Sequence, residues 1–142
     1  MSKKNYITGI GGLFIKSEDP KKMNQWYSDT LNLNTTEYGT TFRFIDERTG
    51  KQAVSQFSFF SEESDYFEPS KKEAMYNFRV RDLEDFLEEL RSKGVQVVGE
   101  VQTFEYGKFA HIIDPEGNKI ELWEPIDSGF GESMEDDSKV NF

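Results

Sequence analysis

The feature that most constrains the fold of this chain is an approximate internal repeat. A shift of 63 residues places Asp19 on Asp82, Met23 on Phe86 and Tyr27 on Leu90. The helix-starting residue and the apolar face of a helix therefore coincide in the two copies. Each copy is typical of a strand, a helix and three further strands. We predict an α+β fold made of two tandem βαβββ modules.

The expected boundaries follow from this pattern. We predict a single domain over residues 1–125, with module one at about 7–60, a polar linker at 61–72 and module two at about 73–125. The last stretch, 126–142, is acidic and rich in Ser and Gly, which indicates disorder. A chain of 142 residues is long enough for one such domain and its core.

Module one is expected to begin with a strand over Tyr6–Lys16, whose glycines permit a bulge or close backbone approach. Asp19 and Pro20 then start a helix that ends near Asn32. The apolar residues of that helix have the spacing of a buried stripe, and they are Met23, Trp26, Tyr27 and Leu31. Strands are predicted at Thr41–Ile45 and Ala53–Phe60, with the end of a short one within Glu37–Thr40.

Module two is expected to begin with a strand over Ala74–Val80. Asp82 caps the following helix, which stops at Gly94. The apolar face of that helix consists of Leu83, Phe86, Leu87 and Leu90. A short strand at Val95–Val98 and a turn at Gly107 precede the final hairpin.

That hairpin, Phe109–Pro125, has two apolar runs around Asp114-Pro115-Glu116-Gly117-Asn118, a composition that favours a turn. Glu121 lies between Ile120 and Leu122 in the second run, so its carboxylate points to the face opposite these neighbours. On the residues alone Glu121 is either an ordinary outward glutamate or a functional carboxylate.

The composition excludes several functions. There are no cysteines, so neither a disulfide nor a thiolate site is possible. A net charge of −10 argues against nucleic acid as a partner and is compatible with a cationic ligand. No apolar run is long enough for a membrane span or a signal peptide, so we expect a cytoplasmic protein. The 13 Phe, 6 Tyr and 2 Trp suit a core or an aromatic-lined pocket.

The string DPEGNKIELWEP resembles the signature that closes the second half of proteins in the vicinal oxygen chelate superfamily, which includes glyoxalase I, extradiol dioxygenases and the fosfomycin- and bleomycin-resistance proteins. The resemblance implies a curved, partly closed mixed sheet around a cleft, and often a homodimer. It places Glu121 at a metal-ligand position. The other three ligand positions of that family would fall on Gly12, Gln56 and Met75, and neither Gly12 nor Met75 can replace imidazole. We therefore expect no cofactor, with a divalent metal as the open alternative.

Further candidates come from the strand pattern. His111, the single histidine, precedes Glu121 across the hairpin and would form a catalytic or weak metal pair with it. Strand alternation directs Met75, Asn77 and Arg79 to one face, where Arg79 suits a carboxylate or phosphate. The predicted ligand-binding set is Phe14, Gln56, Phe60, Asn77, Arg79 and Trp123. Each of these residues also has an ordinary role in a core or at a surface.

Three functions remain open from the sequence. The first is a divergent glyoxalase-like protein, a sensor or accessory protein among the options, that binds a small molecule in the cleft without the full metal site. The second is a metal-dependent lyase, isomerase or dioxygenase, in which a metal polarises adjacent oxygens. The third is a drug-sequestering protein of bleomycin-resistance type. Whether the protein is an enzyme is not decided by these residues.

Overall fold

The computed structural model describes residues 4–126 and 140–141, and it confirms the predicted pair of βαβββ modules. Module one contains β1 (Ile7–Ser17), α1 (Pro20–Leu31), β2 (Thr35–Thr36), β3 (Gly39–Asp46) and β4 (Lys51–Ser61). Module two contains β5 (Ala74–Val80), α2 (Leu83–Ser92), β6 (Gln96–Phe104), β7 (Gly107–Ile113) and β8 (Lys119–Pro125). A further strand, β9 (Val140–Asn141), pairs with β3 and was not predicted. The rest of the predicted disordered tail, except Ile126, lies outside the described residues.

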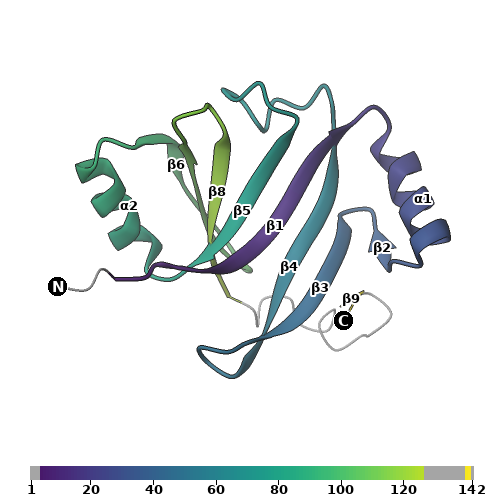
Figure 1. Cartoon of the computed structure of the whole chain (residues 1–142), viewed down its shortest axis with the longest axis horizontal. Coiled ribbons are helices and arrows are strands. Elements are labelled where there is room, and N and C mark those ends of the chain that lie inside the picture. Colours follow the sequence, from purple (N-terminus) through teal and green to yellow (C-terminus); the bar gives the residue numbers. More distant parts are fainter. Residues whose placement is uncertain (1–3, 127–139, 142) are drawn as a thin grey trace.

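All strands belong to one mixed sheet that does not close (Figure 1). Its order is β2-β3-β4-β1-β5-β8-β7-β6, so the first strands of the two modules, β1 and β5, meet at its centre as an antiparallel pair. Each of them also pairs in parallel with the last strand of its own module, β4 or β8. The two modules thus form one continuous sheet.

Both helices cover the same face of this sheet, at opposite ends of it (Figure 1). The ring of Tyr27 in α1 contacts Phe57 of β4. Across β1 and β5, the strand registers align Phe57 with Tyr76 and then with Ile120 of β8, so these residues lie on the same face of the sheet. Ile120 packs on the cluster beneath α2. We call the opposite face, which carries neither helix, the inner face.

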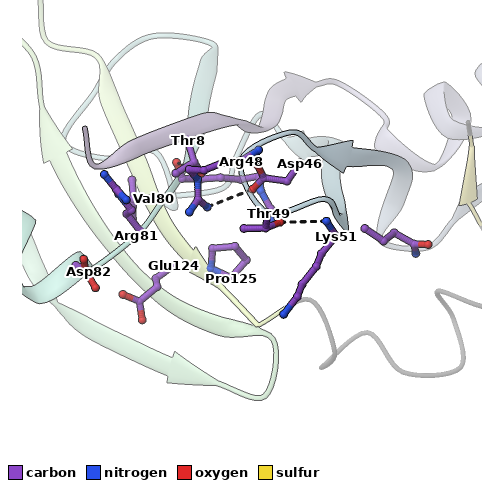
Figure 2. A pocket seen from close by; sticks show the side chains of 12 residues that line it. Thr8, Asp46, Arg48, Thr49, Lys51, Val80, Arg81, Asp82, Glu124 and Pro125 are labelled. Atoms are coloured by element: carbon purple, nitrogen blue, oxygen red, sulfur yellow. Dashed lines mark hydrogen bonds and ion pairs between the residues drawn. The ribbon is translucent and has the colours of Figure 1, made fainter. Parts of the chain in front are cut away.

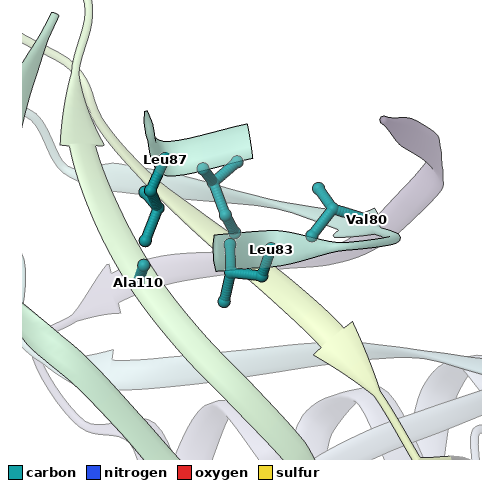
Figure 3. Close-up of a cluster of buried hydrophobic side chains, with 5 residues drawn as sticks. Val80, Leu83, Leu87 and Ala110 are labelled. Carbon is teal, nitrogen blue, oxygen red and sulfur yellow. The ribbon is translucent and has the colours of Figure 1, made fainter. Parts of the chain in front are cut away.

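The core beneath α2 contains five buried apolar residues, Val80, Leu83, Leu87, Ala110 and Leu122 (Figure 3). The predicted apolar face of the helix therefore holds. The predicted cap does not, because Asp82 makes no side-chain hydrogen bond to the helix and pairs with Lys4 instead. The carboxylate of Glu124 accepts the Leu83 N–H at 2.8 Å and takes over that function.

Helix α1 differs from the prediction in its packing. Its start is as expected, since Asp19 accepts the Lys22 N–H at 3.1 Å and Pro20 occupies the first turn. None of its residues is buried, however, and Trp26 and Leu31 are each about half exposed. Within the predicted stripe, Tyr27 contacts the sheet through the rings of Phe57 and Phe59. Trp26 and Leu31 remain at the surface.

The final hairpin is confirmed, with β7 and β8 paired in register and the turn closed by Asp114, whose side chain accepts backbone N–H groups of Glu116 and Asn118. Strand β6 is longer than the predicted Val95–Val98 because the pairing with β7 resumes after an irregularity at Gly99, where φ is +71°. The described residues include no helix with the length and apolar character needed to cross a membrane.

The glycines of β1 act as predicted. Register shifts occur between Ile7 and Gly9 and between Ile10 and Gly12, and both mark bulges. A Cβ at Gly11 would lie only 2.1 Å from Oδ1 of Asn77 on β5, and one at Gly12 only 2.6 Å from the Gln56 carbonyl oxygen. The Gly11 contact crosses from module one to module two, so the two modules approach closely at their seam, whereas the Gly12 contact lies within module one.

The segment between β4 and β5, residues 62–73, is more than a polar spacer. It folds back over the inner face and places Phe67, which has no exposed surface, against Phe14 and Met75. The predicted polar linker at 61–72 takes no account of the Tyr66-Phe67 pair inside it, and this pair is what packs on the sheet. We call residues 62–73 the connecting segment.

Candidate functional site

Four of the predicted site residues lie side by side in a single row across the inner face. The strand registers align Gln56 with Gly12, Gly12 with Asn77, Asn77 with Glu121 and Glu121 with His111. Residues in register share a face of the sheet. The row therefore passes from β4 through the central pair of strands to β7, and Asn77 rather than Met75 is the β5 residue beside Glu121.

Glu121 is the centre of a buried hydrogen-bond cluster. It is 3% exposed, and its Oε1 accepts the Asn77 amide N–H at 2.7 Å. Its Oε2 lies 2.8 Å from Nε2 of His111 and 2.5 Å from the hydroxyl of Tyr66, which donates to it. We call Tyr66, Asn77, His111 and Glu121 the Glu121 cluster.

Tyr66 and Lys119 were not among the predicted site residues. Tyr66 reaches the cluster from the connecting segment, and its ring lies edge-on to His111 with 5.5 Å between centroids. Lys119 lies two residues before Glu121 on the same face and donates from Nζ to the Tyr66 carbonyl at 2.6 Å. The inward position of Lys119 follows from strand alternation. For Tyr66, the available signal was an aromatic pair within a charged segment.

The electrostatics of the cluster favour a protonated tyrosine. Burial raises the pKa of Tyr66, and the nearby carboxylate of Glu121, together with the hydrogen bond to it, raises this pKa further. Burial has the opposite effect on Lys119 and lowers the pKa of its ammonium group. The Tyr66 hydroxyl therefore acts as a hydrogen-bond donor throughout the neutral pH range.

An apolar cluster lies beside the Glu121 cluster. Phe14, Phe67 and Met75 are buried there, and Phe60 and Tyr66 pack on them. The Phe60 ring stacks on Tyr66 at 5.5 Å, and the Phe14 ring meets Phe60 edge-on at 5.5 Å. The predicted residues Phe14 and Phe60 are thus near the Glu121 cluster, as an apolar wall shared with the connecting segment.

Arg79 and Trp123 lie two residues further along β5 and β8 than Asn77 and Glu121, on the side of the row away from Tyr66 and Lys119. The Arg79 guanidinium is buried, donates to the Val54 carbonyl at 2.8 Å and lies 5.2 Å from the Trp123 ring. Trp123 stacks on Phe109 and donates from Nε1 to the Tyr106 carbonyl at 3.0 Å. Gln56 is engaged within module one, where it accepts from Thr41 at 2.6 Å and donates to the Tyr38 carbonyl at 2.8 Å.

These donors do not fit the divalent metal that the resemblance implies. Gly12 has no ligating side chain, and Met75 is enclosed by aromatic rings. The side-chain oxygen of Gln56 accepts from Thr41, and Glu121 Oε2 accepts from Tyr66. Within the described residues no three His, Asp, Glu or Cys side chains are placed to share an ion. Three or more well-placed ligands are the usual minimum for a retained metal.

The arrangement has two chemical capabilities. A buried carboxylate surrounded by neutral donors can bind a ligand hydroxyl or ammonium group, because each displaced donor can be replaced by another. The His111 and Glu121 pair can also hold and move a proton, because an imidazole nitrogen and a carboxylate oxygen lie within hydrogen-bond distance of each other, at 2.8 Å. With Glu121 ionised, Nε2 of His111 carries the proton and donates it.

The fold and the site define a small α+β protein with one carboxylate-centred site on the inner face of a duplicated sheet. Its sequence matches the profile of the Glyoxalase/Bleomycin resistance protein/Dioxygenase superfamily over residues 9–122. The chain belongs to this superfamily, which confirms the predicted resemblance. No curated protein sequence matches the chain.

Solved structures share the fold at low sequence identity. Methylmalonyl-CoA epimerase from Mycobacterium tuberculosis is similar with a TM-score of 0.59 and 22% identity, over 88% of this chain and 93% of that chain. A Streptomyces coelicolor methylmalonyl-CoA epimerase variant in complex with 2-nitronate-propionyl-CoA gives a TM-score of 0.62 and 16% identity, over 84% and 99%. A Legionella pneumophila structure described as an NAD-dependent benzaldehyde dehydrogenase gives 0.52 and 14%, over 80% and 97%.

Proposed function

We propose that this protein binds a small molecule at the Glu121 cluster through hydrogen bonds, without the full metal site of its superfamily. The observation that carries the proposal is the position of the Tyr66 hydroxyl, 2.5 Å from the buried Oε2 of Glu121. Tyr66 there fills the place that a ligand group would take. The same oxygen would face a metal ion if the superfamily's ligand set were complete.

Tyr66 is the exchangeable partner in this cluster. Asn77 and His111 are fixed because they belong to strands that pair in register with the strand of Glu121. Tyr66 belongs to the connecting segment, which contributes no strand to the sheet. Rotation of the Tyr66 side chain would release Oε2 without breaking any strand pairing and without withdrawing Phe67, which is fully buried in the same segment.

The chemistry of the cluster indicates the class of ligand. A carboxylate accepts hydrogen bonds and attracts positive charge, so the ligand would present a hydroxyl or an ammonium group to Glu121. Oδ1 of Asn77, buried beside it against Gly11, has no hydrogen-bond partner among the described residues. The ligand's apolar part would pack on Phe14, Phe60 and Met75.

Proton transfer is the second candidate, and the buried contact between His111 and Glu121 favours it. The similar solved structures include epimerases that are described as acting on methylmalonyl-CoA. In a reaction of that class Glu121 would accept a proton from carbon while Tyr66 or Asn77 would donate hydrogen bonds to the oxygen that gains charge. Drug sequestration of the bleomycin-resistance type is a variant of the binding proposal and draws on the net charge of −10.

A thermal-shift screen tests the binding proposal. Parent protein is heated with members of three groups, namely divalent metals, glutathione-type thiols and cationic glycopeptides, because a ligand raises the apparent stability by mass action. We expect an organic ligand to raise Tm in the parent and to lose this effect in Glu121→Gln. Tyr66→Phe should bind it more tightly, since the competing hydroxyl is gone. Tyr76→Phe, an exposed tyrosine on the outer face, is the matched control.

Two outcomes would contradict the proposal. One is a ligand that stabilises the parent and Glu121→Gln equally. The other is stabilisation by a divalent metal that requires Glu121, which would restore the metal-dependent lyase or dioxygenase reading. The predicted homodimer remains to be measured, and light scattering on a sizing column at micromolar concentration would detect it.

A further inference from the structure

A cavity lies at the end of the sheet where β1 begins and β5 and β8 end, beside the turn between β3 and β4 (Figure 2). Its volume is about 500 Å³, which is within the usual range for sites of small ligands. We propose that this cavity binds a small anionic group, a carboxylate or a phosphate. The proposal goes beyond the Glu121 cluster, because none of the four residues of that cluster lines this cavity.

The lining has a local excess of positive charge. It contains four cationic side chains, those of Arg48, Lys51, Arg79 and Arg81, against three carboxylates. The whole chain carries a net charge of −10, so the sign here is opposite to that of the rest of the protein. A cavity with an excess of one sign attracts small ions of the other sign.

The three carboxylates of the lining are already engaged. Asp46 accepts from the guanidinium of Arg48 at 3.2 Å and from its backbone N–H at 2.9 Å. Asp82 pairs with Lys4, which is outside the lining, and Glu124 accepts the first N–H of α2. The negative charges of these three carboxylates are therefore directed at their own partners and offset little of the positive charge inside the cavity.

Arg81 and Lys51 hold donors available for a ligand. Arg81 donates from Nε to the Asn5 carbonyl at 2.7 Å, which fixes the side chain while its terminal amino groups have no acceptor recorded among the described residues. For the ammonium group of Lys51, the described residues likewise provide no acceptor. Figure 2 shows these two side chains on opposite sides of the cavity.

Arg79 gives the cavity a rigid cationic base. Its side chain is 3% exposed and is held by the Val54 carbonyl and by the rings of Phe44 and Trp123, whose centroids lie 5.5 and 5.2 Å from the guanidinium carbon. A guanidinium fixed in this way loses little freedom when a ligand arrives. Thr8, which also lines the cavity, donates to the Arg79 carbonyl at 3.2 Å and belongs to the same scaffold.

The test is a titration of the full chain with inorganic phosphate and, separately, with acetate, followed by NMR and by thermal shift at constant ionic strength set with chloride. We expect shifts of backbone amides around residues 46–51 and 79–82 that saturate with one of the two anions, and a higher Tm. Phosphate and acetate identify which group is preferred. Arg81→Gln and Lys51→Gln should each weaken the apparent Kd about tenfold, the loss of one charge-assisted hydrogen bond.

Control variants separate this proposal from the proposed function. Lys93→Gln removes an exposed lysine outside the cavity and should leave the titration unchanged. Glu121→Gln should also leave it unchanged, so a failure of the Glu121 proposal does not affect this result. Equal responses to phosphate, acetate and chloride would overturn the proposed anion site. They would mean that the cationic side chains bind anions only as non-specific surface charges. Unaltered binding in both Arg81→Gln and Lys51→Gln would overturn it too.

Discussion

The two modules have the same chain plan and differ in what they bury. In module two, α2 places Leu83 and Leu87 in a closed core, whereas α1 in module one buries none of its residues. The difference extends to the inner face, where module two supplies Asn77, His111 and Glu121 to the polar row. Module one supplies Gly12, which has no side chain, and Gln56, which is bonded to its own neighbours. A duplicated fold can therefore keep its architecture in both halves while the helix with a buried face and most of the candidate site lie in one of them.

The largest expected effect compares the two helices. Leu87→Ala removes a buried side chain and should lower the free energy of unfolding by about 2–5 kcal/mol. Leu31→Ala makes the same change in α1, where Leu31 is 51% exposed, and should change it by no more than about 0.5 kcal/mol. Urea denaturation of both variants measures the difference. Equal losses would show that α1 is packed as tightly as α2.

The second prediction compares equivalent last-strand positions. Glu121→Ala leaves the buried donors of Asn77 and His111 and the partly buried hydroxyl of Tyr66 without their acceptor, so we expect a loss at the upper end of about 1–3 kcal/mol. Gln56→Ala removes a half-buried amide and should cost about 1 kcal/mol. Glu121→Gln keeps the shape of the side chain and one acceptor oxygen, so its loss of unfolding free energy should lie between those of Glu121→Ala and Gln56→Ala. A larger loss for Gln56→Ala in denaturation experiments would reverse the asymmetry of the modules.

The third prediction concerns the seam between the modules. Gly11→Ala would bring a methyl group against Asn77, and we expect overpacking to destabilise the protein by about 1–3 kcal/mol. Gly9→Ala, on the same strand, meets no atom within 4 Å and is the matched control. Thermal unfolding of both variants measures the two effects. If Gly11→Ala is as stable as Gly9→Ala, the close approach of β1 and β5 is not a constraint.

The smallest predicted effect concerns the pH dependence of Tyr66. Because the pKa of Tyr66 is raised in the folded protein, the unfolded chain loses this proton first, near pH 10, and stability should fall above that pH by up to about 1.4 kcal/mol per pH unit. Tyr66→Phe removes this slope and costs about 1 kcal/mol at neutral pH. The lowered pKa of Lys119 gives a slope of the opposite sign in both proteins, so the difference between them isolates Tyr66. Parallel stability curves above pH 10 would contradict the buried hydrogen bond.

The sequence predicted the architecture well because periodicity and turn residues act locally. The repeat of Asp19 and Asp82, and the Asp114 to Asn118 turn, were sufficient to predict two modules and the final hairpin. The packing of α1 was not predictable in this way, since an apolar stripe shows which face can be buried and not whether the sheet beneath it reaches every residue. The cap of α2 was not predictable from local pattern either. Glu124, which lies 42 positions after Asp82 in the chain, accepts the Leu83 N–H in place of Asp82.

The candidate site was partly predictable. Strand alternation directed Asn77 and Glu121 to one face, and the hairpin brought His111 opposite Glu121. Tyr66 was missed because its contact with Glu121 spans 55 residues and depends on how the connecting segment folds over the inner face, which no periodic pattern encodes. The roles proposed for these residues remain predictions.

The central claim is that the Glu121 cluster works through hydrogen bonds and not through the metal site of its superfamily. Elemental analysis tests it most directly, on protein purified without chelator and again after incubation with Zn²⁺, Mn²⁺ and Ni²⁺ followed by desalting. The account predicts no stoichiometric metal in either sample, and no difference between the parent and Glu121→Gln. One equivalent of retained metal in the parent that is lost in Glu121→Gln would contradict it.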